Sequence, residues 1–265
     1  MQLGAIEIMF PGAGADAIEQ AGEVGFAGFE YYVDGPTPAA DPIWTPVGRN
    51  RARRTATTAD VRIPSVCLGY FNDQAWLTAD DPDIRADARD ALARAVDVAA
   101  GFDAPVIQVP FFGPAEIEDD RDEARVVTGV GAVADIAAAA DVCLAIENTL
   151  SAAENIDLLD RIDHPAVSHY YDIGNATALG YDPVEELAVL GDRTAMIHVK
   201  DRFVAGGDPY PHGTMLGDAD VDLAGVTTTL AEIEYDGWLI LETASSAEPL
   251  RDAAENLERA RTVFE

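Results

Sequence analysis

The chain has 265 residues and carries 48 acidic against 17 basic side chains, a formal net charge of −31 at neutral pH. This charge excludes nucleic-acid binding through a general basic face and adhesion to an anionic membrane surface, because both depend on Lys and Arg. Apolar residues make up 48% of the chain, enough for a full-sized core, so the charge does not indicate disorder.

The basic residues are unevenly divided: all are Arg except one, Lys200. Near-absence of Lys together with an acidic excess favours a halophilic protein, whose hydrated surface carboxylates keep it soluble in molar salt. A mesophilic protein that is merely acidic would not explain the missing Lys. The charge therefore describes the solvent more than the substrate, and the position of Lys200 becomes informative.

We expect neither a signal peptide nor a membrane-spanning helix. The first residues have no basic region, and no run reaches the roughly 18 apolar residues of a membrane-spanning helix. Cys67 and Cys143 lie inside apolar runs, which favours buried thiols over a disulfide or a metal site. We expect a cytoplasmic protein, and the sequence is compatible with a homo-oligomer.

Short apolar runs alternate with longer amphipathic stretches along the chain. The runs are bounded by Gly, Pro or Asp, which is typical of buried parallel strands. They are AIEIMF from Ala5, GFEYYV from Gly28, PSVCLGYF from Pro64, PVIQVPFF from Pro105, VCLAIEN from Val142, VSHYYDIGN from Val167, TAMIHVKD from Thr194 and GWLILET from Gly237. The clearest helical periodicity lies in residues 81–100, 121–140, 153–162, 183–190, 222–234 and 248–264. Two of these helices are expected to start at an Asp-Pro pair, 81–82 and 182–183.

Strict alternation of strand and helix predicts an α/β fold with a parallel sheet inside and helices outside. Eight such units over about 250 residues match a closed (β/α)8 TIM barrel, here as a single domain over residues 1–265. The alternative is a doubly wound open sheet, which often has a glycine-rich phosphate loop after its first strand. The stretch PGAGAD lacks the full glycine spacing of that loop, so we interpret it as an ordinary turn.

Metal-capable side chains end four successive strands of the predicted barrel: Glu147, Asp172, His198 and Glu242. In a barrel of this kind the active site lies at the carboxyl ends of the strands. A single acidic residue there would be a strand cap, but four in register predict a metal site. Three carboxylates and one imidazole favour Mn²⁺ or Mg²⁺, while Zn²⁺ or Co²⁺ is also compatible with such a set.

Two cationic side chains follow His198, Lys200 and Arg202. Alternation along a strand places Lys200 on the face of His198, toward the predicted metal site, and places Arg202 there as well if the strand continues. We expect them to bind an anionic part of the substrate, for which phosphate is the natural candidate. A salt bridge from Lys200 to a barrel carboxylate remains the alternative.

Four further side chains are candidates for substrate binding. Asn175 lies just beyond Asp172, and His212 belongs to the long loop after the seventh strand, where it either contacts substrate or is solvated. Glu30, on the second strand, either binds hydroxyl groups or caps its strand. Tyr70 is among the aromatics that either limit water at the site or pack at the barrel mouth.

Several segments carry a family resemblance that spans nearly the whole chain. It is strongest in YYDIGNATALGYDPVEELAVLGDRTAMIHVKDR from Tyr170, and continues in LGDADVDL and LILETAS. These segments resemble the xylose isomerase-like barrel superfamily of sugar isomerases and epimerases. With RIPSVCLGY and VIQVP, the chain looks most like the L-ribulose- or L-xylulose-5-phosphate 3-epimerases. The resemblance implies that Glu147, Asp172, His198 and Glu242 hold the metal and that the two glutamates form the acid/base pair.

The chain also departs from the superfamily pattern. Many relatives have His at the position of Asn175. The phosphopentose epimerases have Asn there, as this chain does. The loop after the seventh strand commonly reads Gly-x-Gly, whereas here residues 217–222 read GDADVD. Tyr70 and Phe71 stand where the compared epimerases have small and His residues. The motifs therefore specify the superfamily better than the substrate.

These residues support a metal-dependent ketose 3-epimerase acting on a sugar or sugar phosphate, with a ketose 5-phosphate favoured. One glutamate would remove the proton beside the carbonyl and the other would return one on the opposite face, through a metal-stabilised enediolate. An aldose–ketose isomerase and an inosose or dehydroshikimate dehydratase are alternatives on the same metal site. A non-catalytic sugar-binding protein is the alternative outside enzymology.

Overall fold

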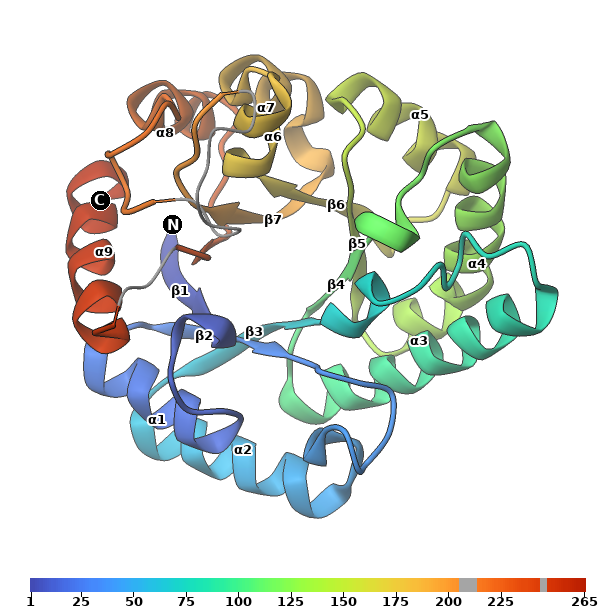
Figure 1. Cartoon of the computed structure of the whole chain (residues 1–265), viewed down its shortest axis with the longest axis horizontal. Helices are drawn as coiled ribbons and strands as arrows, with labels where there is room; N and C mark the ends of the chain where they lie inside the picture. The colour runs from blue at the N-terminus through green and yellow to red at the C-terminus, as the bar shows by residue number, and fades with distance from the viewer. Residues whose placement is uncertain (205–213, 244–246) are drawn as a thin grey trace.

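Eight parallel strands close into a barrel in the computed structural model, which describes residues 1–204, 214–243 and 247–265. The strands pair in chain order, and β1 closes the barrel by pairing with β8. Figure 1 looks into this barrel, with the helices as an outer ring around it. The predicted (β/α)8 fold is therefore confirmed, and the doubly wound open sheet is wrong.

The strands are short, of four to six residues, and lie close to the predicted apolar runs. They are β1 (Gln2–Ile6), β2 (Gly28–Tyr32), β3 (Arg62–Cys67), β4 (Val106–Pro110), β5 (Cys143–Glu147), β6 (Val167–Asp172), β7 (Thr194–Val199) and β8 (Trp238–Leu241). The helices are α1 (Ala15–Val24), α2 (Pro46–Ala59), α3 (Pro82–Phe102), α4 (Asp120–Ala139), α5 (Ala152–Ile162), α6 (Ile173–Leu179), α7 (Pro183–Leu190), α8 (Leu223–Glu232) and α9 (Pro249–Phe264).

Helix starts were the most predictable boundaries. Asp81 and Asp182 cap α3 and α7, each accepting a 2.9 Å hydrogen bond from the backbone two residues on, with Pro in the first turn. Helices α1, α2 and α6 are not among those that the helical periodicity predicts. In α2 only Ala52 and Ala56 are buried, so its Arg- and Thr-rich sequence lacks an apolar stripe.

The first strand begins earlier than the apolar run that predicted it. The run starts at Ala5, yet β1 spans Gln2–Ile6 and residues Glu7–Met9 form a short 3-10 turn. Gly4 explains why the predicted run begins later than β1, because a glycine in a sequence usually indicates the end of a strand. Here it permits close approach of two strands, because a Cβ at Gly4 would lie only 3.1 Å from the carbonyl oxygen of Gly28.

Cys67 is buried and Cys143 half-buried, and both are free thiols. Across residues 1–204, 214–243 and 247–265, no helix combines the length and the apolarity that crossing a bilayer requires.

A buried glutamate just after β1 links the loop that follows β1 to the end of β2. The carboxylate of Glu7 accepts hydrogen bonds from the backbone N–H of Gly14, at 2.6 Å, and of Tyr32, at 3.2 Å. Glu7 is 6% exposed, and burial raises the pKa of its carboxyl to about 7. The native state therefore binds a proton at Glu7 that the unfolded chain releases at lower pH.

The substitution Glu7→Gln should change how stability depends on pH. A raised native pKa stabilises the fold below the unfolded value of 4.5, and this contribution is lost as pH rises through about 7. As pH rises between those limits, the free energy of unfolding of the wild type should fall by up to about 3 kcal/mol relative to that of Glu7→Gln. Denaturant unfolding of both proteins in the same salt measures this difference, and a difference that is constant with pH would contradict it.

Candidate metal centre

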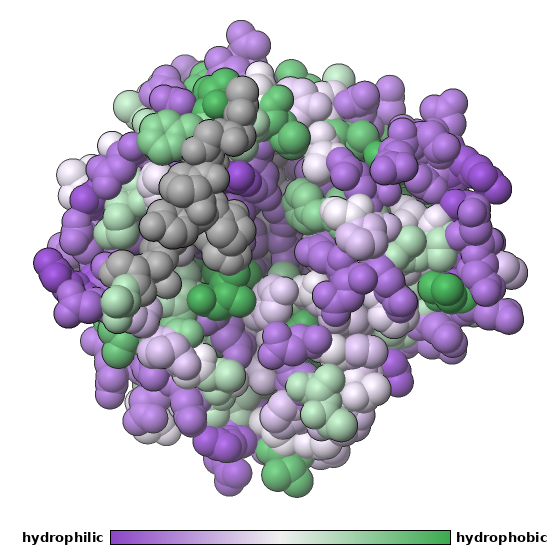
Figure 2. All heavy atoms as spheres, viewed as in Figure 1, coloured by the Kyte–Doolittle hydropathy of each residue, from purple (hydrophilic) through white to green (hydrophobic). Residues whose placement is uncertain are grey.

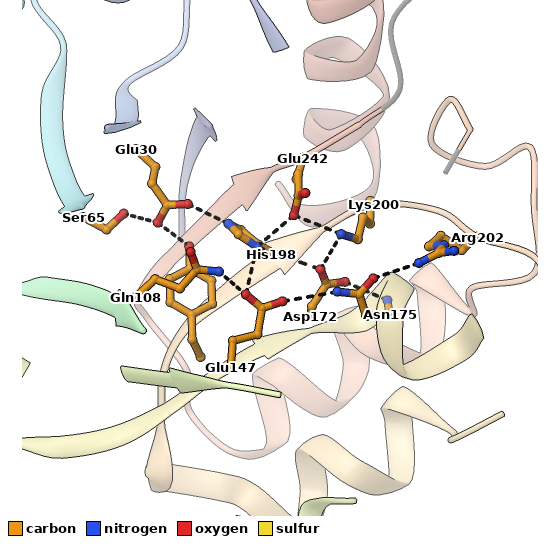
Figure 3. A network of polar contacts seen from close by, with 11 residues as sticks. Glu30, Ser65, Gln108, Glu147, Asp172, Asn175, His198, Lys200, Arg202 and Glu242 are labelled. Carbon is orange, nitrogen blue, oxygen red and sulfur yellow. Dashed lines mark hydrogen bonds and ion pairs between the residues drawn. The ribbon is translucent and has the colours of Figure 1, made fainter. Parts of the chain in front are cut away.

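The four predicted metal ligands meet at one end of the barrel. Glu147 and Asp172 are the last residues of β5 and β6, His198 is the next to last of β7, and Glu242 directly follows β8. Asp172 and His198 are direct partners in the register of β6 and β7. Figure 3 shows the four side chains pointing toward one another. Figure 2 shows a central hollow on the face viewed in Figure 1, with both hydrophilic and apolar residues around it.

The ligand atoms converge on Nδ1 of His198. Its distances are 3.8 Å to Oε2 of Glu147, 3.9 Å to Oδ2 of Asp172 and 3.0 Å to Oε2 of Glu242. One ligand atom each from Glu147, Asp172 and His198 lie within 4.8 Å of one another, close enough to hold one metal ion. All three residues are buried, and the side chain of Glu242 is 12% exposed.

A cation fits these residues on chemical grounds. Nδ1 of His198 and Oδ2 of Asp172 are buried, and neither makes a hydrogen bond of good geometry in the described part of the chain, although Oε2 of Glu242 lies 3.0 Å from Nδ1 and Nζ of Lys200 lies 2.7 Å from Oδ2. Buried polar atoms without such a bond are costly unless another group binds them. A divalent cation between the carboxylates and the imidazole would satisfy both atoms and offset the negative charge.

Lys200 supplies a positive charge beside the same carboxylates. Its Nζ lies 2.7 Å from Oδ2 of Asp172 and 3.0 Å from Oε2 of Glu242, and its side chain is 4% exposed. Burial opposes its charge, but these carboxylates outweigh burial and raise the pKa of Lys200. The salt bridge that the sequence left open as an alternative is thus present, while contact of Lys200 with an anionic substrate stays a prediction.

Arg202 and Asn175 form a chain that ends on Glu147. Nη1 of Arg202 donates to Oδ1 of Asn175 at 2.9 Å, and Nδ2 of Asn175 donates to Oε1 of Glu147 at 3.3 Å. Asp172 also caps α6, accepting the backbone N–H of Asn175 at 2.8 Å. The structure therefore places both predicted substrate-binding residues next to the predicted ligands.

Glu30 contacts the opposite nitrogen of the histidine. Its Oε1 lies 2.7 Å from Nε2 of His198, and its Oε2 accepts hydrogen bonds from Ser65 at 2.6 Å and Tyr170 at 2.8 Å. The carboxylate is fully buried, and Figure 3 shows it on the side of His198 away from Asp172.

The last two candidates lie away from this network. Tyr70 is buried in an aromatic cluster, where its ring contacts those of Trp44, Phe71 and Trp76. It therefore packs at the strand ends, and substrate contact stays a prediction. His212 lies outside the described residues.

Three residues of the network were missed in the sequence. Gln108 donates a hydrogen bond to Oε2 of Glu147, while Ser65 and Tyr170 donate to Glu30. Each is polar within an apolar run, and this is the signal that would have found them. Ser65 is also the direct register partner of Glu30.

Asp201 is a fourth missed residue, and it organises the loop after β7. Its fully buried carboxylate accepts backbone N–H groups from Gly217, Ala219 and Val221 at 2.8 to 3.0 Å. The unusual GDADVD sequence is therefore held next to the site by one side chain from the end of β7.

Burial dominates the protonation of the centre. Desolvation raises the pKa of Glu147 to about 8, against the attraction of His198. For His198, burial favours the neutral ring, but the carboxylates of Glu30 and Glu242 outweigh it and hold the pKa of the imidazole well above its usual value. A cation would have to displace protons from both groups.

Mn²⁺ should bind more tightly as pH rises through about 8, because Glu147 must lose its proton before its carboxylate can act as a ligand. Isothermal calorimetry on metal-free protein, in two buffers of different ionisation enthalpy, measures both the affinity and the protons released. We expect proton release that declines above that pH.

The variant Asp172→Asn tests the ligand assignment, because it keeps the shape of the side chain but removes its charge. Its loss of Mn²⁺ affinity should exceed the about 10- to 100-fold that loss of an outer-shell partner causes. Binding that is indifferent both to pH and to this substitution would show that Mn²⁺ binds elsewhere.

Comparison with known proteins agrees with this fold. A family model described as "Xylose isomerase-like TIM barrel" matches residues 18–263. Solved structures with similar folds include a D-allulose 3-epimerase from Methylomonas sp., with a TM-score of 0.80, 19% identity, and coverage of 99% of this chain and 97% of that one. A D-psicose 3-epimerase from Clostridium cellulolyticum H10 has a TM-score of 0.79 at 19% identity, with both chains fully covered.

Curated relatives are more similar in sequence. "Putative L-ribulose-5-phosphate 3-epimerase SgbU" of Escherichia coli K12 is 28% identical over 219 residues, covering 78% of this chain and 76% of its own. "L-ribulose-5-phosphate 3-epimerase UlaE" of Salmonella typhi is 27% identical over 209 residues, with coverage of 76% and 70%. "2-epi-5-epi-valiolone 7-phosphate 2-epimerase" of Actinoplanes sp. is 28% identical over 201 residues, with coverage of 76% and 72%.

Proposed function

The chain belongs to the xylose isomerase-like TIM barrel family, and we propose that it is a divalent-metal-dependent ketose 3-epimerase acting on ketose 5-phosphates. The observation that carries this proposal is the placement of two glutamates on either side of His198. In Figure 3, Glu147 and Glu242 approach the histidine from opposite sides, and both have an oxygen within 4 Å of Nδ1.

Epimerisation requires proton transfer on both faces of one carbon. A base removes the proton from the carbon beside the carbonyl, and an acid delivers a proton to the opposite face. We assign these two roles to Glu147 and Glu242. A divalent cation held by Glu147, Asp172, His198 and Glu242 would supply the positive charge that stabilises the developing oxyanion.

The polar neighbours hold the two glutamates in place for this chemistry. Gln108 and Asn175 each donate a hydrogen bond to Glu147, one to either oxygen. Lys200 donates to Oε2 of Glu242 at 3.0 Å. Catalytic carboxylates fixed by such contacts need little reorganisation when a proton is transferred.

A phosphorylated substrate is supported by two observations. The curated relatives named above act, by their names, on sugar phosphates or related phosphates. In addition, Arg202 lies at the edge of the network, where its Nη1 donates a hydrogen bond to Asn175. Arg202 is therefore our candidate for the phosphate contact, since guanidinium groups bind phosphate in a bidentate manner.

A screen of ketoses and ketose 5-phosphates with Mn²⁺ in molar KCl and deuterated water tests the proposal. We expect turnover of the phosphorylated sugars, with deuterium appearing at C3 of the product. Deuterium at C1 or C2 would indicate an aldose–ketose isomerase instead, and a new enone absorbance would indicate a dehydratase. Turnover of free sugars alone would contradict the phosphate-binding role of Arg202.

The variants Glu147→Gln and Glu242→Gln test the assignment of the acid/base pair. Each should lower kcat by about 10²- to 10⁴-fold, because a carboxamide cannot transfer the proton. Substrate binding, followed by calorimetry at saturating Mn²⁺, should survive in both. Glu258→Gln, on the exposed face of α9, is the matched control and should leave kcat unchanged. Full turnover in either site variant would refute the two-base scheme.

A further inference from the structure

We propose that Glu30 is a positioning residue of the metal centre: it fixes the imidazole of His198 with Nδ1 facing the metal, and it does not contact substrate. The inference rests on the metal-binding part of the proposed function and goes beyond it, because it assigns a role to a residue outside the set of four ligands.

The contact between Glu30 and His198 determines which nitrogen can bind a metal. Oε1 of Glu30 lies 2.7 Å from Nε2 of His198, and both side chains are almost fully buried. Oε2 of Glu30 already accepts hydrogen bonds from Ser65 and Tyr170, so we assign Oε1 as the acceptor of a hydrogen bond from Nε2. The nitrogen left to bind a metal is then Nδ1, the atom that faces Glu147, Asp172 and Glu242.

Glu30 is itself held in place by side chains from two other strands. Ser65 on β3 and Tyr170 on β6 donate to Oε2, at 2.6 Å and 2.8 Å. The ring of Tyr170 also packs edge-on against the imidazole, with centroids 4.5 Å apart. The carboxylate and the imidazole ring are therefore both fixed, and the imidazole has no freedom to exchange its two nitrogens.

The same contacts argue against hydroxyl binding by Glu30. Its side chain has no solvent exposure, and each of its oxygens already has a partner within 2.8 Å. A sugar hydroxyl would have to replace Ser65, Tyr170 or His198. An anionic partner on the proton of a metal-binding histidine instead raises the basicity of the ligand, and its loss usually weakens metal affinity.

The test uses Glu30→Gln, which preserves the shape of the side chain and its capacity to accept from Nε2 but removes the charge. Calorimetric titration of Mn²⁺ without any sugar should show affinity about 10- to 100-fold weaker than in the wild type. At saturating Mn²⁺, KM should be unchanged. Glu7→Gln is the matched control, since it neutralises another buried glutamate outside the centre, and its Mn²⁺ affinity should equal that of the wild type.

A second variant keeps the inference testable if Glu30→Gln fails to fold. The double change Ser65→Ala and Tyr170→Phe releases Oε2 of Glu30 but leaves the contact to His198, so it should weaken Mn²⁺ affinity by less than Glu30→Gln does. Nitrogen-15 NMR of the Mg²⁺-loaded wild type should show the proton of His198 on Nε2.

Unchanged Mn²⁺ affinity in both variants would overturn the inference, as would a raised KM in Glu30→Gln with normal Mn²⁺ affinity, since that pattern belongs to a substrate contact. Because the Mn²⁺ titration needs no sugar, failure of the proposed epimerase activity is recognised separately. A wild type that binds Mn²⁺ and depends on Glu30 but turns over no ketose would support this inference and refute the proposed function.

Discussion

Four carboxylates gathered around His198, three of them buried, set the electrostatic constraint on which the rest of this site depends. Glu30, Glu147, Asp172 and Glu242 belong to β2, β5, β6 and the end of β8, and all are held within a network centred on His198. Burying an ionised carboxylate is strongly unfavourable unless a positive charge or several hydrogen bonds compensate. The contacts around the centre are best understood as ways of meeting that requirement.

The protein meets it in part with its own residues. Lys200, the single lysine of the chain, lies between Asp172 and Glu242, and His198 faces Glu30 with one nitrogen and the other three carboxylates with the second. Protonation adds to this, because burial raises the pKa of Glu147 to about 8. A divalent cation would complete the compensation, and the pattern of charge therefore links fold stability, metal binding and proton transfer at one place. The acidic surface and the acidic centre are separate features, since the centre carries its own cations.

Much of this was predictable from the sequence because it depends on local periodicity. Alternating runs and amphipathic stretches predicted the barrel, and the end of each run predicted Glu147, Asp172, His198 and Glu242 as neighbours. Asp-Pro pairs predicted the starts of α3 and α7, because capping is a local interaction. The start of β1 was not predictable in this way, since Gly4 is explained by its approach to Gly28 on the next strand.

The parts that sequence did not predict depend on contacts between distant residues. Glu30 and His198 are 168 positions apart, and Glu30 and Tyr170 are 140 apart, so no local pattern distinguishes a histidine partner from a hydroxyl-binding group. Lys200 was correctly expected on the face of His198, but strand alternation alone does not show that its ammonium group forms ion pairs with two carboxylates. Asp201 was missed because its partners are backbone N–H groups, which leave no mark in the sequence.

The central claim is that these strand-end side chains form one divalent metal centre with Nδ1 of His198 as the nitrogen ligand. Anomalous diffraction from crystals grown with Mn²⁺ tests it most directly. The account predicts one strong peak per chain in contact with Glu147, Asp172, Nδ1 of His198 and Glu242, with Glu30 still on Nε2. A peak located elsewhere, or a His198 ring turned to present Nε2 to the metal, would contradict it.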